Sequence, residues 1–587
     1  MGGLRLFTTL TSSHLIYVHD IGLNHPIVQE KLRYFADYFN FTAINIGKME
    51  RLALDNHISI LDKLLFHLGQ NKKYRHDYVE AYLTHALWHD TKLISGFEAY
   101  GAFDRKRRKY PITESGASKK RWVTVNEKAL GRSARALLRT LTQHLFRKTL
   151  DTIVARVLCG CDLTKHQVEI ESLIRTLVSQ YVFAGNSRED IVELFSRIIT
   201  RDAKKYPFPK ALAKAPDEEK QQYLANLKLR AQLRAVHHHL QREAQHGVYI
   251  FRLIGITAPD DFMFTYDRVT FIHPKHPKLA QIVAQFKDDK FRDGYLDRED
   301  CLIATIRVKH KSPTEALLHA AEIVRTEMDY LKAQVGDQFF LETKSHLETR
   351  DYSRAWGSIS FDKGLTRIHN MDRDRLLDTP HRALRRVKGS AKQTILKHEL
   401  LFIKASTSRL PSDCWHYIEA MLNPVDEHSG AIRRAGVAVL LKDQSKVERR
   451  TLHSYLINAT SHLATSKELL GLSDKTWELL YRTPYNREAQ FMNLVEQHVS
   501  TPIIKRLVQM YRDSVSSSAA YLDLLFLECL GQRNSMTHSN EFHGPSMISC
   551  TRTSVGLAAR LRLSIVTLTR ENPKLGYREI LRLCGAA

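Results

Sequence analysis

Several features that define common classes of protein are missing from this 587-residue sequence. No apolar run approaches the roughly 20 residues that a membrane-spanning helix needs, so we expect no membrane partner. There is no Gly-rich phosphate loop with Lys, no paired-Asp polymerase motif and no Ser-His-Asp constellation. The first residues lack a clear secretory core, and Leu6 occupies the position where a myristoylation signal requires Ser or Thr. We therefore expect a cytoplasmic location.

Cysteine is sparse, with seven residues at scattered positions. Cys159 and Cys161 stand one residue apart, which is too close for ordinary zinc-knuckle spacing, and no second pair completes four ligands. We predict that all seven are reduced thiols, as is usual in the cytoplasm. The sequence therefore predicts no metal site and no cofactor.

Acidic residues are outnumbered by basic ones. The chain has 64 Asp and Glu against 88 Lys and Arg, a formal net charge of +24. Such an excess favours a polyanionic partner, and aromatic side chains beside basic ones can stack on bases. We predict nucleic-acid contacts, with a solvated basic loop as the alternative, at two segments: Arg105, Lys106, Arg107, Arg108 and Lys109 beside Tyr110, and Lys119, Lys120 and Arg121 beside Trp122.

The hydrophobic pattern divides the chain into three parts. Residues 1–235 carry apolar side chains at three- and four-residue intervals, which predicts a helical N-terminal domain. Residues 236–365 contain β-rich segments at 248–254, 268–272 and 301–308 and a helix at 316–331, which predicts a small α+β middle module. Residues 366–587 return to helical periodicity and suffice for a bundle. The predicted fold is mainly α and multidomain.

Two patterns in the first part have both a functional and a structural interpretation. His85 and His89 are four residues apart, the spacing that puts two imidazoles on one helix face, and could belong to an HD-type metal phosphohydrolase. Apolar neighbours favour core histidines instead. The turn at Gly185 and Asn186, with Ser187 and Asp190 as a weak capping box, predicts a helix-turn-helix pair. We favour two packed core helices over a DNA-reading element.

A polar motif near the C-terminus contains the residues most indicative of catalysis. An apolar run at 524–530 is followed by Arg533 and Asn534, then by His538, a turn-rich break and a second apolar stretch at 555–568. A neutral imidazole can transfer a proton near neutral pH, and a guanidinium can hold a phosphate through two parallel hydrogen bonds. A metal-free ribonuclease needs these two groups to handle the 2′-hydroxyl proton and to stabilise the phosphorane.

Arg533-Asn534-Ser-Met-Thr-His538 resembles the Arg-Asn-x-x-x-His form of the Arg-x4–6-His motif of HEPN-superfamily ribonucleases. Upstream, the segment 415–422 resembles the aromatic, Glu-bearing early helix of the ApeA-like branch of anti-phage defence proteins. The resemblance covers at most the last third of the chain. It implies a C-terminal HEPN-like helical bundle at 366–587, catalytic roles for Arg533, Asn534 and His538, and an orienting role for Glu419.

By the same resemblance the chain would be a metal-independent endoribonuclease and an abortive-infection effector in anti-phage defence. RNA would be its substrate, a homodimer or higher homo-oligomer its active form, and a phage-derived trigger or a regulatory protein its further partner. The alternative is a non-catalytic nucleic-acid-binding scaffold, in which the basic faces bind and the motif is structural.

The spacing of the motif sets a geometric condition. Residues five apart on a regular helix lie about 140° apart around its axis, so Arg533 and His538 would diverge. Either the backbone departs from helix there, or a second copy of the chain completes the site. Arg234 and His239 have the same spacing inside a polar helical run without the Asn, and we predict that this second match is structural.

Overall fold

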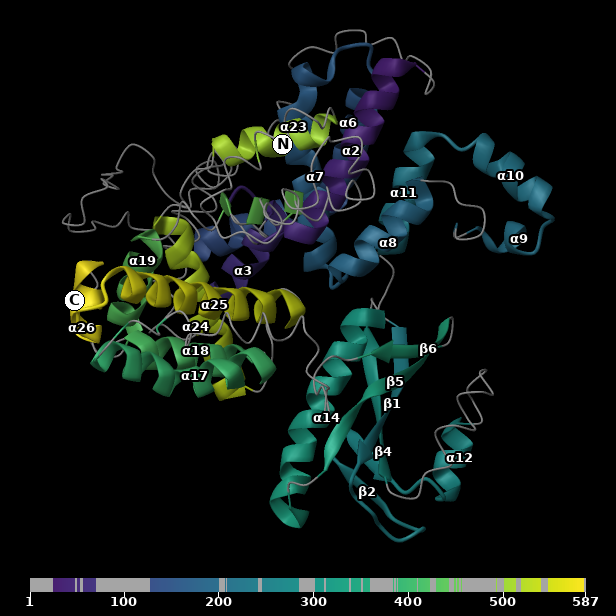
Figure 1. Ribbon diagram of the computed structural model, residues 1–587. Coiled ribbons are helices and arrows are strands. Elements are labelled where there is room, and N and C mark those ends of the chain that lie inside the picture. Colours follow the sequence, from purple (N-terminus) through teal and green to yellow (C-terminus); the bar gives the residue numbers. More distant parts are fainter. Residues whose placement is uncertain are drawn as a thin grey trace, which may run out of the picture.

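The computed structural model describes residues 25–47, 50–52, 56–69, 127–199, 206, 208–240, 245–283, 301–310, 313–336, 339–349, 352–358, 384, 387, 389–408, 410–422, 429–442, 448–449, 451–452, 455–456, 492, 501–513, 519–539 and 547–584. Across these residues helices predominate, and one antiparallel sheet lies to the side of the helical bodies (Figure 1). The prediction of a mainly α protein is confirmed, and the strands form a small antiparallel sheet. Within this part of the chain, no helix has both the length and the apolar content needed to cross a bilayer.

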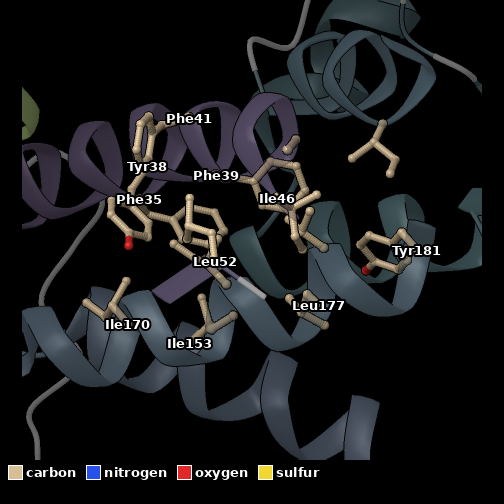
Figure 2. Packing of buried hydrophobic residues seen from close by; sticks show 14 of the residues in the cluster. Phe35, Tyr38, Phe39, Phe41, Ile46, Leu52, Ile153, Ile170, Leu177 and Tyr181 are labelled. Carbon is tan, nitrogen blue, oxygen red and sulfur yellow. The ribbon is translucent and has the colours of Figure 1, made fainter. Parts of the chain in front are cut away.

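The N-terminal helices build the first of two large helical cores. Its members from this part of the chain are α2 (Pro26–Asn45), α3 (His57–Gly69), α6 (Glu127–Leu158), α7 (Leu163–Phe183), α8 (Arg188–Ile199) and α11 (Leu229–Leu240), with η2 (Glu50–Leu52), α9 (Lys210–Ala213) and α10 (Asp217–Ala225) beside them. Figure 2 shows aromatic side chains of α2 packed against aliphatic ones of α6 and α7. The rings of Phe39 and Phe195 stack with their centroids 3.7 Å apart, which joins α2 to α8.

The turn between α7 and α8 follows the sequence signals closely. Gly185 adopts a φ of 93°, a left-handed conformation that ends α7. Ser187 Oγ then accepts a hydrogen bond from the backbone N–H of Asp190 at 3.0 Å, which caps α8. Asn186 Nδ2 donates to the carbonyl oxygens of Tyr181 and Leu240, at 2.9 and 2.8 Å, and so ties both helices to α11. These contacts support the interpretation of the pair as packed core helices.

The first core also takes in segments from far along the chain. Helix α23 (Pro502–Arg512) packs against α2, and Leu452, Leu456 and Met492 belong to the same cluster. Arg506 on α23 forms two hydrogen bonds with the Glu171 carboxylate of α7, at 2.8 and 3.0 Å, and Tyr34 Oη donates to the same carboxylate at 2.6 Å. The boundaries at 235 and 365 stay predictions, but the first core does not end at residue 235.

A second core lies among the C-terminal helices. They are α17 (Ser390–Ser408), α18 (Pro411–Leu422), α19 (Ser429–Lys442), α24 (Ala519–Ser539), α25 (Met547–Glu571) and α26 (Tyr577–Leu583). Arg562 of α25 is held by the Glu399 carboxylate of α17 and lies 4.4 Å from the centroid of the Phe402 ring. Arg433 of α19 pairs with Asp523 of α24 at 2.8 Å. These polar ties and the apolar core hold the five long helices together (Figure 1).

The sheet has six strands in the order β2-β3-β4-β1-β5-β6, with every neighbouring pair antiparallel. The strands are β1 (Gln245–Ile254), β2 (Met263–Tyr266), β3 (Val269–Ile272), β4 (Cys301–His310), β5 (Phe340–Thr349) and β6 (Tyr352–Ser358). Helix α14 (Pro313–Val335) covers one face and α12 (Pro277–Val283) covers part of the other (Figure 1). Alternation places Tyr249 and Phe251 under α14 and Ile250 under α12, because successive strand residues face opposite sides.

Candidate functional site

The motif predicted to be catalytic lies on the last turns of α24. The helix continues to Ser539, so Arg533, Asn534 and His538 all have helical backbone. The first of the two alternatives, a departure from helix at the motif, is therefore not what the structure shows. A five-residue offset on this helix separates the two catalytic candidates by about 140° around its axis. Arg533 is half-buried, and the side chains of Asn534 and His538 lie outside the described residues.

The earlier turns of α24 are enclosed on several sides. Leu524 and Leu527 belong to the first core, whereas Phe526 and Cys529 belong to the second. A Cβ on Gly436 of α19 would overlap the Phe526 ring, so α19 and α24 approach as closely as a glycine allows. Residues 531–533 are half-buried instead of buried. The motif thus begins where the helix leaves the shared core.

An ion pair also joins α24 to the N-terminal helices. Lys63 Nζ of α3 lies 2.5 Å from Glu528 Oε1, and both side chains are mostly buried. Because α24 contacts both cores through apolar side chains and through this pair, the backbone beneath the motif is held from two sides. Rigid elements of this kind are the usual support for groups that must be positioned accurately.

Helix α18 confirms the helical expectation for the segment 415–422. Trp415 is fully buried, and its Nε1 donates to Glu419 Oε1 at 2.6 Å on the same helix. Glu419 is half-buried, and α18 packs against both α24 and α25. The Glu419 carboxylate is therefore fixed by its neighbour Trp415. Its role in orienting Arg533 or His538 stays a prediction.

Two thiols lie beneath the motif in the second core. Cys529 of α24 approaches the Pro411 carbonyl oxygen at 4.0 Å, which places the first turn of α18 beside α24. Burial raises the pKa of the Cys529 thiol to about 12 and raises the pKa of Cys414 well above its usual range. Burial thus disfavours the thiolate form of both residues, and both pack within the second core.

The second occurrence of the spacing, at Arg234 and His239, lies on α11 as expected. Arg234 Nη2 lies 3.8 Å from Asp151 Oδ1 of α6, and Arg230 Nε lies 3.1 Å from the same oxygen. His237, which lies between Arg234 and His239 in the sequence and is half-buried, stacks on the Phe146 ring with centroids 5.4 Å apart. These contacts tie α11 to α6 and support the structural interpretation.

Several predicted residues cannot be located. The proposed nucleic-acid contacts Arg105, Lys106, Arg107, Arg108, Lys109, Lys119, Lys120 and Arg121 lie outside the described residues, as do His85 and His89. The two basic segments and the histidine pair therefore remain sequence-based expectations.

One cluster was missed from the sequence. Cys159, Cys161 and His166 each offer a donor atom, and these atoms all lie within 4.8 Å of one another. The sequence signal is Cys-x-Cys-x4-His, in which the third donor is a histidine on the next helix instead of a second pair of cysteines. The six cysteines whose side chains the structure describes are free thiols, in agreement with the predicted reduced state.

Comparison of the chain with family models, with curated proteins and with solved structures gives no match.

Proposed function

We propose that the chain is a metal-independent endoribonuclease of HEPN type. Arg533 binds the scissile phosphate, His538 transfers a proton, and Asn534 orients one of them; the products carry a 2′,3′-cyclic phosphate and a 5′-hydroxyl. The observation that supports this proposal is the position of the motif on the end of α24, directly after turns buried in both cores. That position combines a firmly held backbone with residues that are less buried.

The proposed active form is a homodimer or a higher homo-oligomer. Because α24 is helical through Ser539, Arg533 and His538 diverge around its axis. One chain then offers too few groups to supply both a proton donor and a proton acceptor around one phosphate. Two copies related by a two-fold axis supply both.

The first test is cleavage of total RNA by the purified full-length chain. His538→Ala and Arg533→Ala should each lower the rate by about 10²-fold or more, because each removes a group that acts in the transition state. His416→Ala on α18 and Arg578→Ala on α26 are matched controls, since both residues are exposed on the same group of helices. Undiminished cleavage by both motif variants would refute the assignment.

Separate measurements test the RNA cleavage chemistry and the site shared between two chains. Cleavage should persist in EDTA, and the 3′ ends should resist ligation until the cyclic phosphate is opened. Mixing His538→Ala chains with Arg533→Ala chains should restore partial activity, or either variant, mixed with parent chains, should reduce the activity of the parent. A fully active monomer in sedimentation at the assay concentration would contradict the shared site.

The charge of +24 favours a second candidate, a non-catalytic nucleic-acid-binding scaffold. In both cases, Ala at 105–109 and 119–121 should weaken binding across all RNA sequences and flatten the dependence of log affinity on log salt. Tight binding without any cleavage, in the parent as in His538→Ala, would favour the scaffold. By resemblance, the cellular role of the nuclease is growth arrest or death of a phage-infected cell, which His538→Ala should abolish.

A further inference from the structure

The loop between α6 and α7 brings together three side chains that commonly bind metals. Cys159 lies just after α6 and is buried, Cys161 lies in the loop, and His166 lies on the first turn of α7. Cys161 and His166 are half-buried, so solvent reaches one side of the cluster. Their donor atoms all lie within 4.8 Å of one another. We propose that Cys159, Cys161 and His166 bind a zinc ion, with a water molecule as the fourth ligand.

The spacing fits zinc after a small movement. A tetrahedral ion with Zn–S near 2.3 Å and Zn–N near 2.0 Å separates neighbouring donors by about 3.8 Å or less. A sulfur–nitrogen pair needs about 3.5 Å, so donors within 4.8 Å must close by about 1.3 Å at most, which side-chain rotation can supply. Two thiolates and an imidazole favour zinc over magnesium or calcium, which prefer oxygen ligands.

A buried lysine gives the second and independent observation. Lys31 of α2 is 0% exposed, and its Nζ donates to Cys159 Sγ at 3.0 Å, to the Arg156 carbonyl oxygen at 3.1 Å and to the Cys159 carbonyl oxygen. Two of these acceptors are uncharged carbonyl oxygens, and the third is the cysteine sulfur. A buried ammonium is costly without a counter-charge. In the structure the Cys159 thiol donates to the Arg156 carbonyl oxygen at 3.1 Å. A metal-bound thiolate would give up that hydrogen bond, supply the counter-charge and accept the N–H···S hydrogen bond from Lys31.

A carboxylate is placed to orient the histidine. Glu169 Oε2 lies 3.7 Å from His166 Nδ1, and Arg156 donates to both oxygens of Glu169 at 2.7 and 3.3 Å. Histidine ligands commonly donate their second ring nitrogen to such a group, which fixes the tautomer and the ring orientation. Glu169 is therefore assigned to positioning His166 instead of binding the ion.

The charges and protons balance. At neutral pH, binding releases one proton from each thiol to solvent, so that two thiolates and a neutral imidazole surround one Zn²⁺. The site then carries no net charge of its own, with the Lys31 ammonium beside it. Such an ion would fasten the end of α6 to the start of α7 and, through Lys31, to α2. It belongs to the first core and is independent of the motif on α24.

The test is metal analysis of the purified full-length chain. The parent, prepared under reducing conditions, should contain about one zinc ion per chain. Cobalt should replace zinc and produce a thiolate-to-cobalt charge-transfer band with the visible bands of a tetrahedral site. Cys161→Ser and His166→Ala should lose most of the zinc and the charge-transfer band, and both replace half-buried side chains, so they are expected to fold. Circular dichroism checks that they do.

Matched controls are Cys584→Ser on the last turns of the chain and His144→Ala, an exposed residue of α6. Both should keep the metal of the parent. A reduced parent that takes up neither zinc nor cobalt would overturn the proposal. The proposal would also be overturned if mass spectrometry found a Cys159–Cys161 disulfide and the chain failed to bind zinc after that disulfide was reduced. Equal zinc in the parent and in both ligand variants would also refute it.

Discussion

Replacing Arg506 by Ala should loosen α23 from the first core. Glu171 is 9% exposed, and its carboxylate accepts two hydrogen bonds from Arg506, at 2.8 and 3.0 Å, and one from Tyr34 at 2.6 Å. The hydrogen bond to Glu171 raises the pKa of Arg506, so this guanidinium remains charged. The substitution leaves the Glu171 carboxylate buried without its cation.

The expected loss follows from the burial of the two partners. Removing one member of a fully buried ion pair costs about 3–5 kcal/mol. The Arg506 side chain is 25% exposed, so solvent screens part of the interaction and we expect about 2–3 kcal/mol. Since about 1.4 kcal/mol changes an equilibrium tenfold, local opening of α23 should become roughly 30- to 140-fold more frequent.

Amide hydrogen exchange measures this local opening directly. A single melting temperature is not well defined for a chain with several cores, because the cores can unfold separately. Amides of residues 502–512 should exchange faster in Arg506→Ala, and amides of α25 should not change. Lys505→Ala is the matched control, because the neighbouring Lys505 is exposed on the same helix. Unchanged protection of α23 in a folded Arg506→Ala chain would refute the assignment of this pair as the tie between distant segments.

Gly436→Ala should destabilise the C-terminal helices by about 1–3 kcal/mol, because the new Cβ overlaps the Phe526 ring. The control Gly556→Ala should be neutral or stabilising, because nothing lies within 4 Å of its new Cβ. Thermal unfolding that ranks the two variants in the opposite order would contradict this packing. Burial lowers the pKa of His237, so its imidazole takes up a proton at a higher pH in the unfolded chain than in the folded chain. The contribution of neutral His237 to the free energy of unfolding is fully present above the ordinary histidine pKa. It is lost as the pH falls through the lower pKa of His237 in the folded chain. His237→Phe, which keeps a ring against Phe146, should reduce the fall in melting temperature between pH 7 and pH 5, and an identical fall would exclude a contribution from His237.

Sequence patterns predicted the elements whose causes are local. The break at Gly185 and the cap at Ser187 were both found where expected, because a left-handed glycine and a hydroxyl acceptor act within a few residues. The helix expected at 316–331 lies within α14, and three strands were located within a few residues. Strands β2, β5 and β6 were not predicted. β5 contains the polar run Glu342-Thr-Lys-Ser-His346, which lacks the apolar alternation of a half-buried strand.

The sequence by itself therefore determined the helical character of the chain, the caps and turns, and the pattern Arg533-Asn534-…-His538, since each depends on neighbours within one or two turns. Only the tertiary structure decided that the Arg506–Glu171 pair, 335 residues apart, joins α23 to the first core, and that Lys31 lies against Cys159 across 128 residues. Pairings over such separations depend on which apolar faces pack together and leave no local periodicity to detect. The continuation of α24 through the motif also required the structure, because the same residues are compatible with a helix that ends at Gly531.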